Sequence, residues 1–225
     1  MNNHYKTYIS GGLSGIIEIF FIHPIEYYKT VKQTNPTPIN FNQFVFETYR
    51  KNNIFGFYKG FYPRLVGIIP MRTMFWGSLF TAENKLNKLG YDRKHIPLLS
   101  GLFGGFTQTL IDCPIESLKT KMMVKSDKVQ LNFNGMIPNM ARNIGFAICF
   151  MYGKRNINIG INNKFTNDIV VGSISGVSAS VITQPFDYLK TQKQYYDNKK
   201  TLLSIIKNTN LRTFYSGGLS RAIIT

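Results

Sequence analysis

Cysteine and acidic residues are scarce in this chain. It has 2 cysteines in 225 residues, Cys113 and Cys149, and both lie within apolar runs, so the sequence contains no disulfide framework and no cysteine-based metal site. Asp and Glu number 11 against 27 Lys and Arg, which gives a formal net charge of +16. That excess of basic residues suits an anionic partner, such as nucleic acid, an acidic membrane surface or an anionic metabolite.

Residues that would indicate catalysis or targeting are also sparse. The three histidines, His4, His23 and His95, are far apart along the chain and form no local nucleophile or metal-binding pattern. The first ten residues, MNNHYKTYIS, contain neither the apolar core of a signal peptide nor an Arg-rich amphipathic presequence. We therefore expect a protein that is not an enzyme, with no cofactor and no metal, whose targeting information is internal.

One short pattern occurs three times along the chain. It reads Pro, any residue, an acid, two residues, Lys, Thr, and it appears as HPIEYYKT at 23–30, CPIESLKT at 113–120 and QPFDYLKT at 184–191. A G-x-x-x-G pair precedes each copy, at Gly11 and Gly15, at Gly101 and Gly105, and at Gly172 and Gly176. We expect neighbouring helices to pack closely at these glycines. The pattern predicts three repeats, at 1–89, 90–163 and 164–225, of which the second has a shortened middle segment.

Long windows with at most one charged residue indicate membrane helices. Five such windows lie between Lys6 and Glu26, Arg64 and Glu83, Lys94 and Asp112, Lys128 and Lys154, and Asp168 and Asp187. Each is roughly long enough to cross a bilayer core, which takes about 20 residues. A soluble helical repeat is the alternative, but its helices would carry a polar stripe that these windows lack. A sixth helix is expected to be cut short, because the chain ends eight residues after Gly217, a rise of about 12 Å.

Three copies of P-x-[DE]-x-x-[KR], each closing an odd-numbered helix and following a G-x-x-x-G pair, resemble the mitochondrial carrier family over essentially the whole chain. The resemblance implies an all-α membrane protein, in which three two-helix repeats form a six-helix bundle with threefold pseudo-symmetry and short matrix helices. It implies a multi-pass protein of the mitochondrial inner membrane that works as a monomer. The Asn-, Ile-, Lys-, Tyr- and Phe-rich composition is typical of an AT-rich genome such as that of a giant DNA virus, in which case the membrane belongs to a host cell.

The repeated motif suggests a gate. Proline inside a helix removes a backbone hydrogen bond and clashes with the preceding turn, so we expect kinks at Pro24, Pro114 and Pro185. Past each kink, an acid and a base three residues apart project to the same side of the helix. The resemblance implies that these charges pair between repeats and close the matrix side: Glu26 with Lys119, Glu116 with Lys190, and Asp187 with Lys29. The alternative is that they are solvated helix ends.

Two further expectations follow from the resemblance, one for this matrix gate and one for the cytoplasmic side. Gln33 and Gln194 lie nine residues after their prolines, where the family often has a glutamine that braces an ion pair, whereas the second repeat has Met123 there. At the opposite, cytoplasmic side, the usual acidic residue of the even-numbered helices is missing, because the first repeat has Phe80 at that position and FMYGKRN of the second repeat contains no acid. We therefore expect a weak or absent salt-bridge network on that side.

Substrate contacts are implied on the even-numbered helices near mid-membrane. An alignment on Gly60, Gly135 and Gly217 places them at Gly67, Met71, Arg72 and Phe75, at Arg142 and Asn143, and at Ile224. Arg72 and Arg142 are single charges inside apolar windows, which is costly unless they face water or a partner, and their guanidinium groups suit phosphate or carboxylate. Phe75, Trp76 and Phe146 are candidates for stacking on a base, with simple packing as the alternative. Glu18 has no assigned role.

The expected function is alternating-access exchange of an anionic metabolite. Nucleotides or deoxynucleotides rank first, because the net charge of +16 suits a phosphate ester. Carboxylic or keto acids rank second, because Arg142 followed by a polar residue resembles carriers of such acids. A basic membrane or nucleic-acid-binding protein without transport is the third reading. Under the favoured readings nucleic acid is not a partner, and the basic segments lie on the matrix side, where they can contact anionic lipid.

Overall fold

All regular structure in the described residues is helical. The computed structural model describes residues 2–35, 39–124, 132–157, 159–160, 163–196 and 199–224, and it describes side chains from residue 17 onward. The elements are α1 (Asn2–Thr34), α2 (Phe41–Asn52), the 3-10 helix η1 (Ile54–Tyr58), α3 (Phe61–Lys88), α4 (Ile96–Val124), α5 (Met136–Asn156), α6 (Lys164–Ile182), α7 (Gln184–Tyr196), α8 (Leu202–Lys207), α9 (Leu211–Phe214) and α10 (Gly218–Ile224). The expected all-α fold is confirmed.

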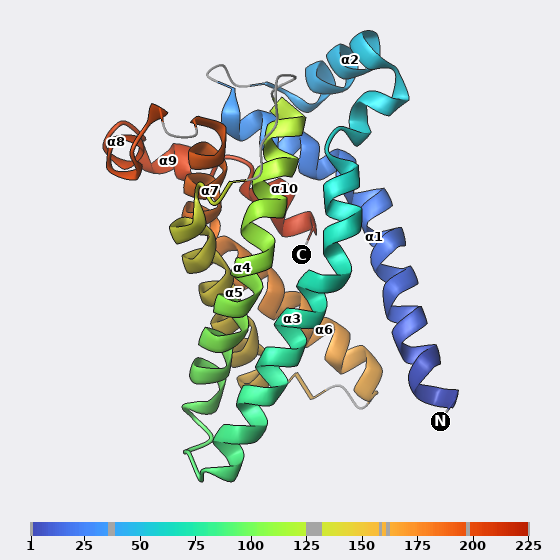
Figure 1. The fold of residues 1–225 in the computed structure, drawn as a ribbon, viewed down its shortest axis with the longest axis vertical. Helices are drawn as coiled ribbons and strands as arrows, with labels where there is room; N and C mark the ends of the chain where they lie inside the picture. The colour runs from blue at the N-terminus through green and yellow to red at the C-terminus, as the bar shows by residue number, and fades with distance from the viewer. Residues whose placement is uncertain are drawn as a thin grey trace.

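The long helices α3, α4 and α5 lie side by side, with α1 and α6 next to them (Figure 1). The short helices α2 and α8 lie at the end of the molecule opposite the turn that joins α3 to α4 (Figure 1). By length and composition, two described helical stretches are apolar enough to cross a membrane, Ile54–Lys88 and Lys164–Ile182. Many large apolar side chains face outward from the bundle, including Phe21, Phe103 and Ile169. Outward-facing apolar side chains are what a helix bundle in lipid requires.

The three motif prolines have two different effects on their helices. α1 continues through Pro24 and α4 continues through Pro114, and α1 changes direction towards its C-terminal end (Figure 1). The third helix is interrupted instead, because α6 ends at Ile182 and α7 begins at Gln184, with Pro185 as its second residue. Pro185 has no N–H with which to continue the hydrogen-bond ladder of α6. The expected kink at Pro185 is therefore a break between two helices.

Three glycines start the helices α3, α5 and α10 and join them to other helices. All three adopt positive φ angles, 77° at Gly60, 84° at Gly135 and 77° at Gly217, which glycine tolerates best. An added Cβ would meet Lys119 O at 2.9 Å, Lys190 O at 3.2 Å and Lys29 Cγ at 3.0 Å, respectively. Each of these helices therefore begins against a motif lysine, which links α3 to α4, α5 to α7 and α10 to α1.

Side chains before two of the prolines tie the same regions together. His23 Nε2 lies 2.9 Å from the carbonyl oxygen of Lys59, and Gln184 Nε2 donates to the carbonyl oxygen of Ser216 at 3.0 Å. Each carbonyl belongs to the residue that directly precedes a helix-starting glycine. α1 is thereby held to the start of α3, and α7 to the start of α10.

The G-x-x-x-G pairs differ in their packing. Gly101 and Gly105 allow α4 to approach α5, since a Cβ would lie 3.0 Å from Ile148 Cγ1 at the first and 2.5 Å from Ile144 Cα at the second. At Gly172 a Cβ would meet no described atom within 4 Å, so the expected close packing at this glycine is wrong. Gly176 is buried in α6. Gly11 and Gly15 lie in the part of α1 outside the described side chains, and their role stays a prediction.

The close contact at Gly105 predicts a marked effect of one added methyl group. Gly105→Ala should lower the stability of the detergent-solubilised protein by about 1–3 kcal/mol, because α4 and α5 must separate to accommodate it. Gly172→Ala is the matched control and should leave stability unchanged or raise it by up to about 1 kcal/mol, as alanine favours a helix. Thermal unfolding of the two variants measures the difference. Equal unfolding temperatures would contradict the packing described for α4 and α5.

Candidate functional site

A polar cavity of about 430 Å³ lies between α1, α3, α4, α5, α6, α7 and α10. This volume falls within the range of small-molecule sites, about 300–1,000 Å³. Twelve of its lining residues are charged, namely Lys29, Arg64, Arg72, Lys119, Arg142, Lys190 and Arg221, and Glu18, Glu26, Asp112, Glu116 and Asp187. Seven basic and five acidic side chains leave the described wall with a net charge of +2. The cavity therefore favours an anion.

The six motif charges lie at one end of this cavity and form a charged ring. Lys119 Nζ lies 3.3 Å from Glu26 Oε2, Lys190 Nζ lies 2.9 Å from Glu116 Oε2, and Lys29 Nζ lies 2.6 Å from Asp187 Oδ2. These are the three pairs expected from the sequence, and they connect α1 to α4, α4 to α7 and α7 back to α1. Glu116, Lys119, Asp187 and Lys190 are buried. Within the helices, Lys119 also contacts Glu116 at 3.0 Å and Lys190 contacts Asp187 at 3.9 Å.

Arg64 of α3 also contacts the charged ring, and this residue was not identified from the sequence. Its Nη1 atom lies 2.9 Å from Glu116 Oε1, and its Nη2 atom lies 3.9 Å from Glu26 Oε1. The spacing from the helix-starting glycine is a signal that could have found it, because Arg64 follows Gly60 by four residues, as Arg221 follows Gly217. Arg64 bridges the acids of α1 and α4 and so adds a helix to the ring.

One of the two expected glutamine braces contacts the ring. Gln33 Nε2 donates to Asp187 Oδ2 at 3.4 Å and to the carbonyl oxygen of Ser216 at 3.1 Å. Gln194 accepts a hydrogen bond from Thr120 Oγ1 at 2.9 Å, and within the described part of the chain no bond joins it to an ion pair. Gln194 lies one turn beyond Lys190 on α7, where it faces α4 past the ring. The expected brace at Gln194 is therefore wrong.

Arg142 of α5 joins the cavity to the charged ring. Its Nη2 atom lies 2.8 Å from Asp112 Oδ2, and its Nη1 atom lies 3.2 Å from Asp187 Oδ1. Asn143 accepts hydrogen bonds from Arg142 Nε at 3.1 Å and from Nη2 at 2.8 Å. Asp112 had no role assigned from the sequence, although this acid lies two residues before Pro114, where the other motifs have Ile22 and Thr183.

The second intramembrane arginine has a separate partner. Arg72 Nη2 lies 2.5 Å from Glu18 Oε2, which gives Glu18 a role that the sequence left open. Both side chains are nearly half exposed, 49% for Arg72 and 42% for Glu18. This pair is accessible from the cavity and is less constrained than the buried pairs of the ring.

The remaining expected substrate contacts are mostly on the cavity wall. Met71, Phe75, Trp76, Asn143, Phe146 and Ile224 line it. The rings of Phe75 and Trp76 meet edge to face with centroids 5.0 Å apart. Gly67 is placed elsewhere, because a Cβ there would lie 2.6 Å from Ile115 Cδ1 of α4. Gly67 is therefore a packing residue between α3 and α4.

The opposite end of the bundle has one weak ionic contact among the described residues. Arg155 Nη2 of α5 lies 3.6 Å from Glu83 Oε1 of α3, and both side chains are partly exposed. Arg155 also donates to the carbonyl oxygen of Arg93 at 2.9 Å, and Tyr152 donates to that of Lys94 at 2.8 Å. These contacts join α5 to the turn between α3 and α4 without forming a ring.

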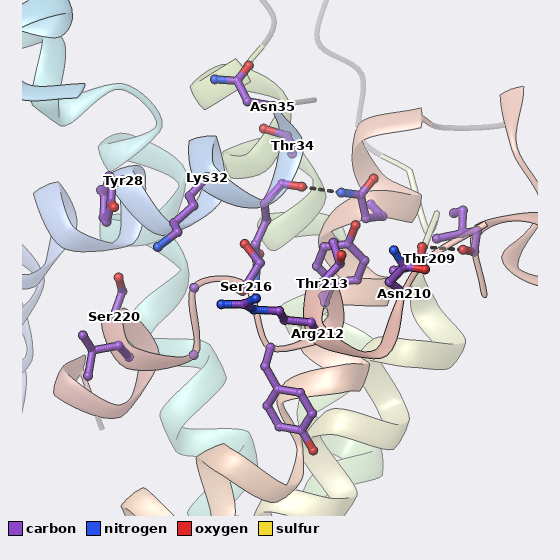
Figure 2. A pocket seen from close by; sticks show the side chains of 18 of the residues that line it. Tyr28, Lys32, Thr34, Asn35, Thr209, Asn210, Arg212, Thr213, Ser216 and Ser220 are labelled. Carbon is purple, nitrogen blue, oxygen red and sulfur yellow. Dashed lines mark hydrogen bonds between the residues drawn. The ribbon is translucent and has the colours of Figure 1, made fainter. Parts of the chain in front are cut away.

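A second, wider pocket of about 1,090 Å³ lies between the C-terminal end of α1 and helices α7 to α10 (Figure 2). Its described wall includes the bases Lys32, Lys200 and Arg212 and no acid. Among the described residues, no group of three or more His, Cys, Asp or Glu side chains could hold a metal ion. The polar features of both pockets therefore suit anions.

Comparison with known proteins shows similarity to mitochondrial carriers along most of the chain. The mitochondrial carrier protein family matches residues 2–89 and 162–224. The chain is 27% identical over 256 residues to the mitochondrial tricarboxylate transport protein of Bos taurus, covering 96% of this chain and 82% of that protein. It is 25% identical over 268 residues to the mitochondrial 2-oxodicarboxylate carrier of Bos taurus, covering 98% and 88%. It is 24% identical over 264 residues to the mitochondrial glycine transporter of Xenopus laevis, covering 99% and 85%.

Burial of the charged ring predicts that Arg64 matters for stability. Arg64→Gln should cost about 3 kcal/mol, because it removes one cation from two partly or fully buried acids. Arg155→Gln is the matched control and should cost less than about 1 kcal/mol, as its ion pair is partly exposed. Thermal unfolding in detergent compares them. A smaller loss for Arg64→Gln than for Arg155→Gln would contradict the bridging role of Arg64.

Proposed function

Because the chain belongs to the mitochondrial carrier protein family, whose members are multi-pass transporters of the inner mitochondrial membrane and not enzymes, we propose that it exchanges anionic carboxylates across that membrane. The observation that carries this proposal is the cavity of about 430 Å³, whose described wall has a net charge of +2 and presents Arg72 and Arg142. Two net positive charges match a small dicarboxylate.

The polar groups of the cavity favour carboxylate chemistry. Arginine forms strong charge-assisted hydrogen bonds with carboxylates, and Arg72 and Arg142 lie on helices α3 and α5. Asn143 beside Arg142 accepts hydrogen bonds from its Nε and Nη2 atoms and so fixes the guanidinium group in the cavity wall. The names of two similar carriers, tricarboxylate transport protein and 2-oxodicarboxylate carrier, fit this chemistry.

The charged ring is proposed as the matrix gate of an alternating-access carrier made of three repeats, 1–89, 90–163 and 164–225. Its ion pairs hold α1, α4 and α7 together in the wall of the cavity. Breaking a buried pair leaves uncompensated charges, so the closed ring is stable until substrate contacts offset the loss. A ligand that binds the open form more tightly shifts the population towards it.

Nucleotides are the second candidate. Four aromatic rings line the cavity, those of Phe75, Trp76, Phe146 and Phe150, and a base can stack on such a surface. We place nucleotides behind carboxylates, because a nucleoside diphosphate or triphosphate carries more negative charge than the wall offsets.

Two further expectations concern the surroundings of the carrier. The wider pocket suits an anionic lipid headgroup, because its three described bases face no acid there. Function as a monomer is expected, since helices of one chain surround the cavity. An origin in an AT-rich viral genome, and hence a place in a host mitochondrion, stays a prediction from composition.

Exchange in liposomes tests the proposed substrate class. Vesicles containing the purified carrier and preloaded with unlabelled citrate or 2-oxoglutarate should take up the labelled compound faster than empty vesicles. Vesicles preloaded with ADP or dATP should take up the labelled nucleotide slowly. Arg142→Gln should raise the KM for the carboxylate at least about tenfold, equivalent to about 1.4 kcal/mol of lost binding.

The outcomes separate the candidate functions. Nucleotide exchange without carboxylate exchange would replace the first candidate by the second. An absence of saturable exchange for both classes would favour a basic membrane protein that does not transport. Lys207→Gln is the control for general loss of charge, since this exposed residue of α8 lies outside the cavity wall.

A further inference from the structure

Arg142 is shared between two carboxylates that lie on different helices. Asp112 belongs to α4 and Asp187 to α7, whereas Arg142 belongs to α5. The two contacts use different nitrogen atoms, Nη2 for Asp112 at 2.8 Å and Nη1 for Asp187 at 3.2 Å. One cation therefore connects the wall of the cavity to an acid of the charged ring.

The contact with Asp112 is the more strongly supported of the two. Asp112 Oδ2 also accepts hydrogen bonds from Asn139 Nδ2 at 3.2 Å and from Asn143 Nδ2 at 3.1 Å. Asp112 is buried, with 1% of its surface exposed, and Asn143 is further fixed by a hydrogen bond to Thr109 Oγ1 at 3.0 Å. Three donors on one oxygen hold this carboxylate in place, because charge-assisted hydrogen bonds are stronger than neutral ones.

Asp187 has alternatives to Arg142. Lys29 lies 2.6 Å from its Oδ2 atom, and Gln33 donates to the same atom at 3.4 Å. Lys190 lies 3.9 Å from Oδ1. If Arg142 moves its Nη1 atom to another anion, Asp187 keeps two cations as neighbours. Of its two carboxylate contacts, Arg142 can therefore give up the one with Asp187 at the lower cost in free energy.

The acid and the base of the Asp112–Arg142 pair occur at their two positions in the second repeat alone. The residues two positions before the other motif prolines are Ile22 and Thr183, and those seven positions after the other helix-starting glycines are Gly67 and Ile224. An acid and a base therefore occur together at these two positions in one repeat and are absent from both positions in the other two. Their joint presence indicates that the charges work as a pair.

We propose that Asp112 is a resident counter-ion that positions Arg142 and allows it to release Asp187 when a substrate carboxylate arrives. The substrate oxygen replaces Asp187 Oδ1 at Arg142 Nη1, while Asp112 stays bound at Nη2. α7 then loses its ionic link to α5, and the charged ring becomes easier to open. No proton moves and no bond other than these hydrogen bonds changes.

Asp112 determines how easily this exchange occurs. With Asp112 present, Arg142 always has one carboxylate partner, so leaving Asp187 does not strand a buried guanidinium. Without it, Asp187 is the only protein carboxylate that contacts Arg142 in the described structure, and their bond resists opening. The cavity wall would also gain one net positive charge, which favours initial binding of an anion. Loss of Asp112 should thus slow turnover without weakening binding.

Exchange kinetics of Asp112→Asn in liposomes test this role. The maximal rate per folded carrier should fall about tenfold, whereas the KM should stay within about twofold of the wild-type value or decrease. Asp112→Glu restores the carboxylate and should recover at least about half of the rate. Asp168→Asn is the matched control, because it makes the same chemical change at an exposed position at the start of α6 and should change neither parameter.

A double variant shows whether Asp112 acts through Arg142. Asp112→Asn in an Arg142→Gln background should cause no further loss of rate, because the bond that Asp112 weakens is already absent. Multiplied losses would overturn the proposal, and so would a KM for Asp112→Asn raised about tenfold at an unchanged maximal rate. An Asp112→Asn protein too unstable to assay by thermal unfolding would also contradict it, by making Asp112 a structural residue.

This inference rests on the proposed transport function, but it fails separately from the choice of substrate. The kinetics are measured with whichever anion the wild-type carrier exchanges, carboxylate or nucleotide, since both bind a guanidinium. Exchange of nucleotides alone would overturn the carboxylate proposal and leave the counter-ion role intact. Carboxylate exchange together with multiplied losses of rate in the double variant would support the carboxylate proposal and overturn the counter-ion role of Asp112.

Discussion

Burial of unlike charges between three helices is the interaction on which the rest of the structure depends. Asp187 and Glu116 are buried, and in the described part of the chain each pairs with bases from other helices and from its own next turn. Because an unpaired buried charge costs several kcal/mol, α1, α4 and α7 must converge for the pairs to form. Under the proposed gating, the same energetics make the ring a two-state element, since partial opening strands charges on both sides.

The surrounding structure positions the ring in a consistent way. Gly60, Gly135 and Gly217 start α3, α5 and α10 in close contact with the motif lysines, so these three helices are fixed relative to the ring. Arg64 and Arg142 then reach from α3 and α5 to its acids. The cavity and the charged ring therefore share one connected set of charges, which is the basis of the proposed coupling between substrate binding and the ring.

Sequence periodicity predicted the parts of this arrangement that depend on position along a helix. The motif spacing indicates the six ring residues, and the observed pairs are those that the resemblance to the carrier family implies. Contacts that depend on which side of a helix faces a neighbour were harder to predict. Gln194 points past the ring towards Thr120, and Gly172 faces open space, although both stand at repeat-equivalent positions.

Two charges that contact the ring or its partner Arg142 lie outside the repeated motif. Arg64 and Asp112 were visible in the sequence as single charges next to apolar windows, but their partners come from helices that are distant in sequence. Spacing alone does not specify such pairs, because it gives no register between one repeat and the next. Comparison of equivalent positions across the repeats would have singled out Asp112, which replaces Ile22 and Thr183.

The most direct test of the ring as a gate is the exchange rate of a carrier in which Glu26→Lys and Lys119→Glu are combined. The double variant restores an ion pair of opposite polarity between α1 and α4, although the base introduced on α1 would then lie near Arg64 and recovery should be partial. We predict faster exchange by the double variant than by either single reversal. Exchange by the double variant that is as slow as by the worse single variant would contradict the pairing on which the account is built.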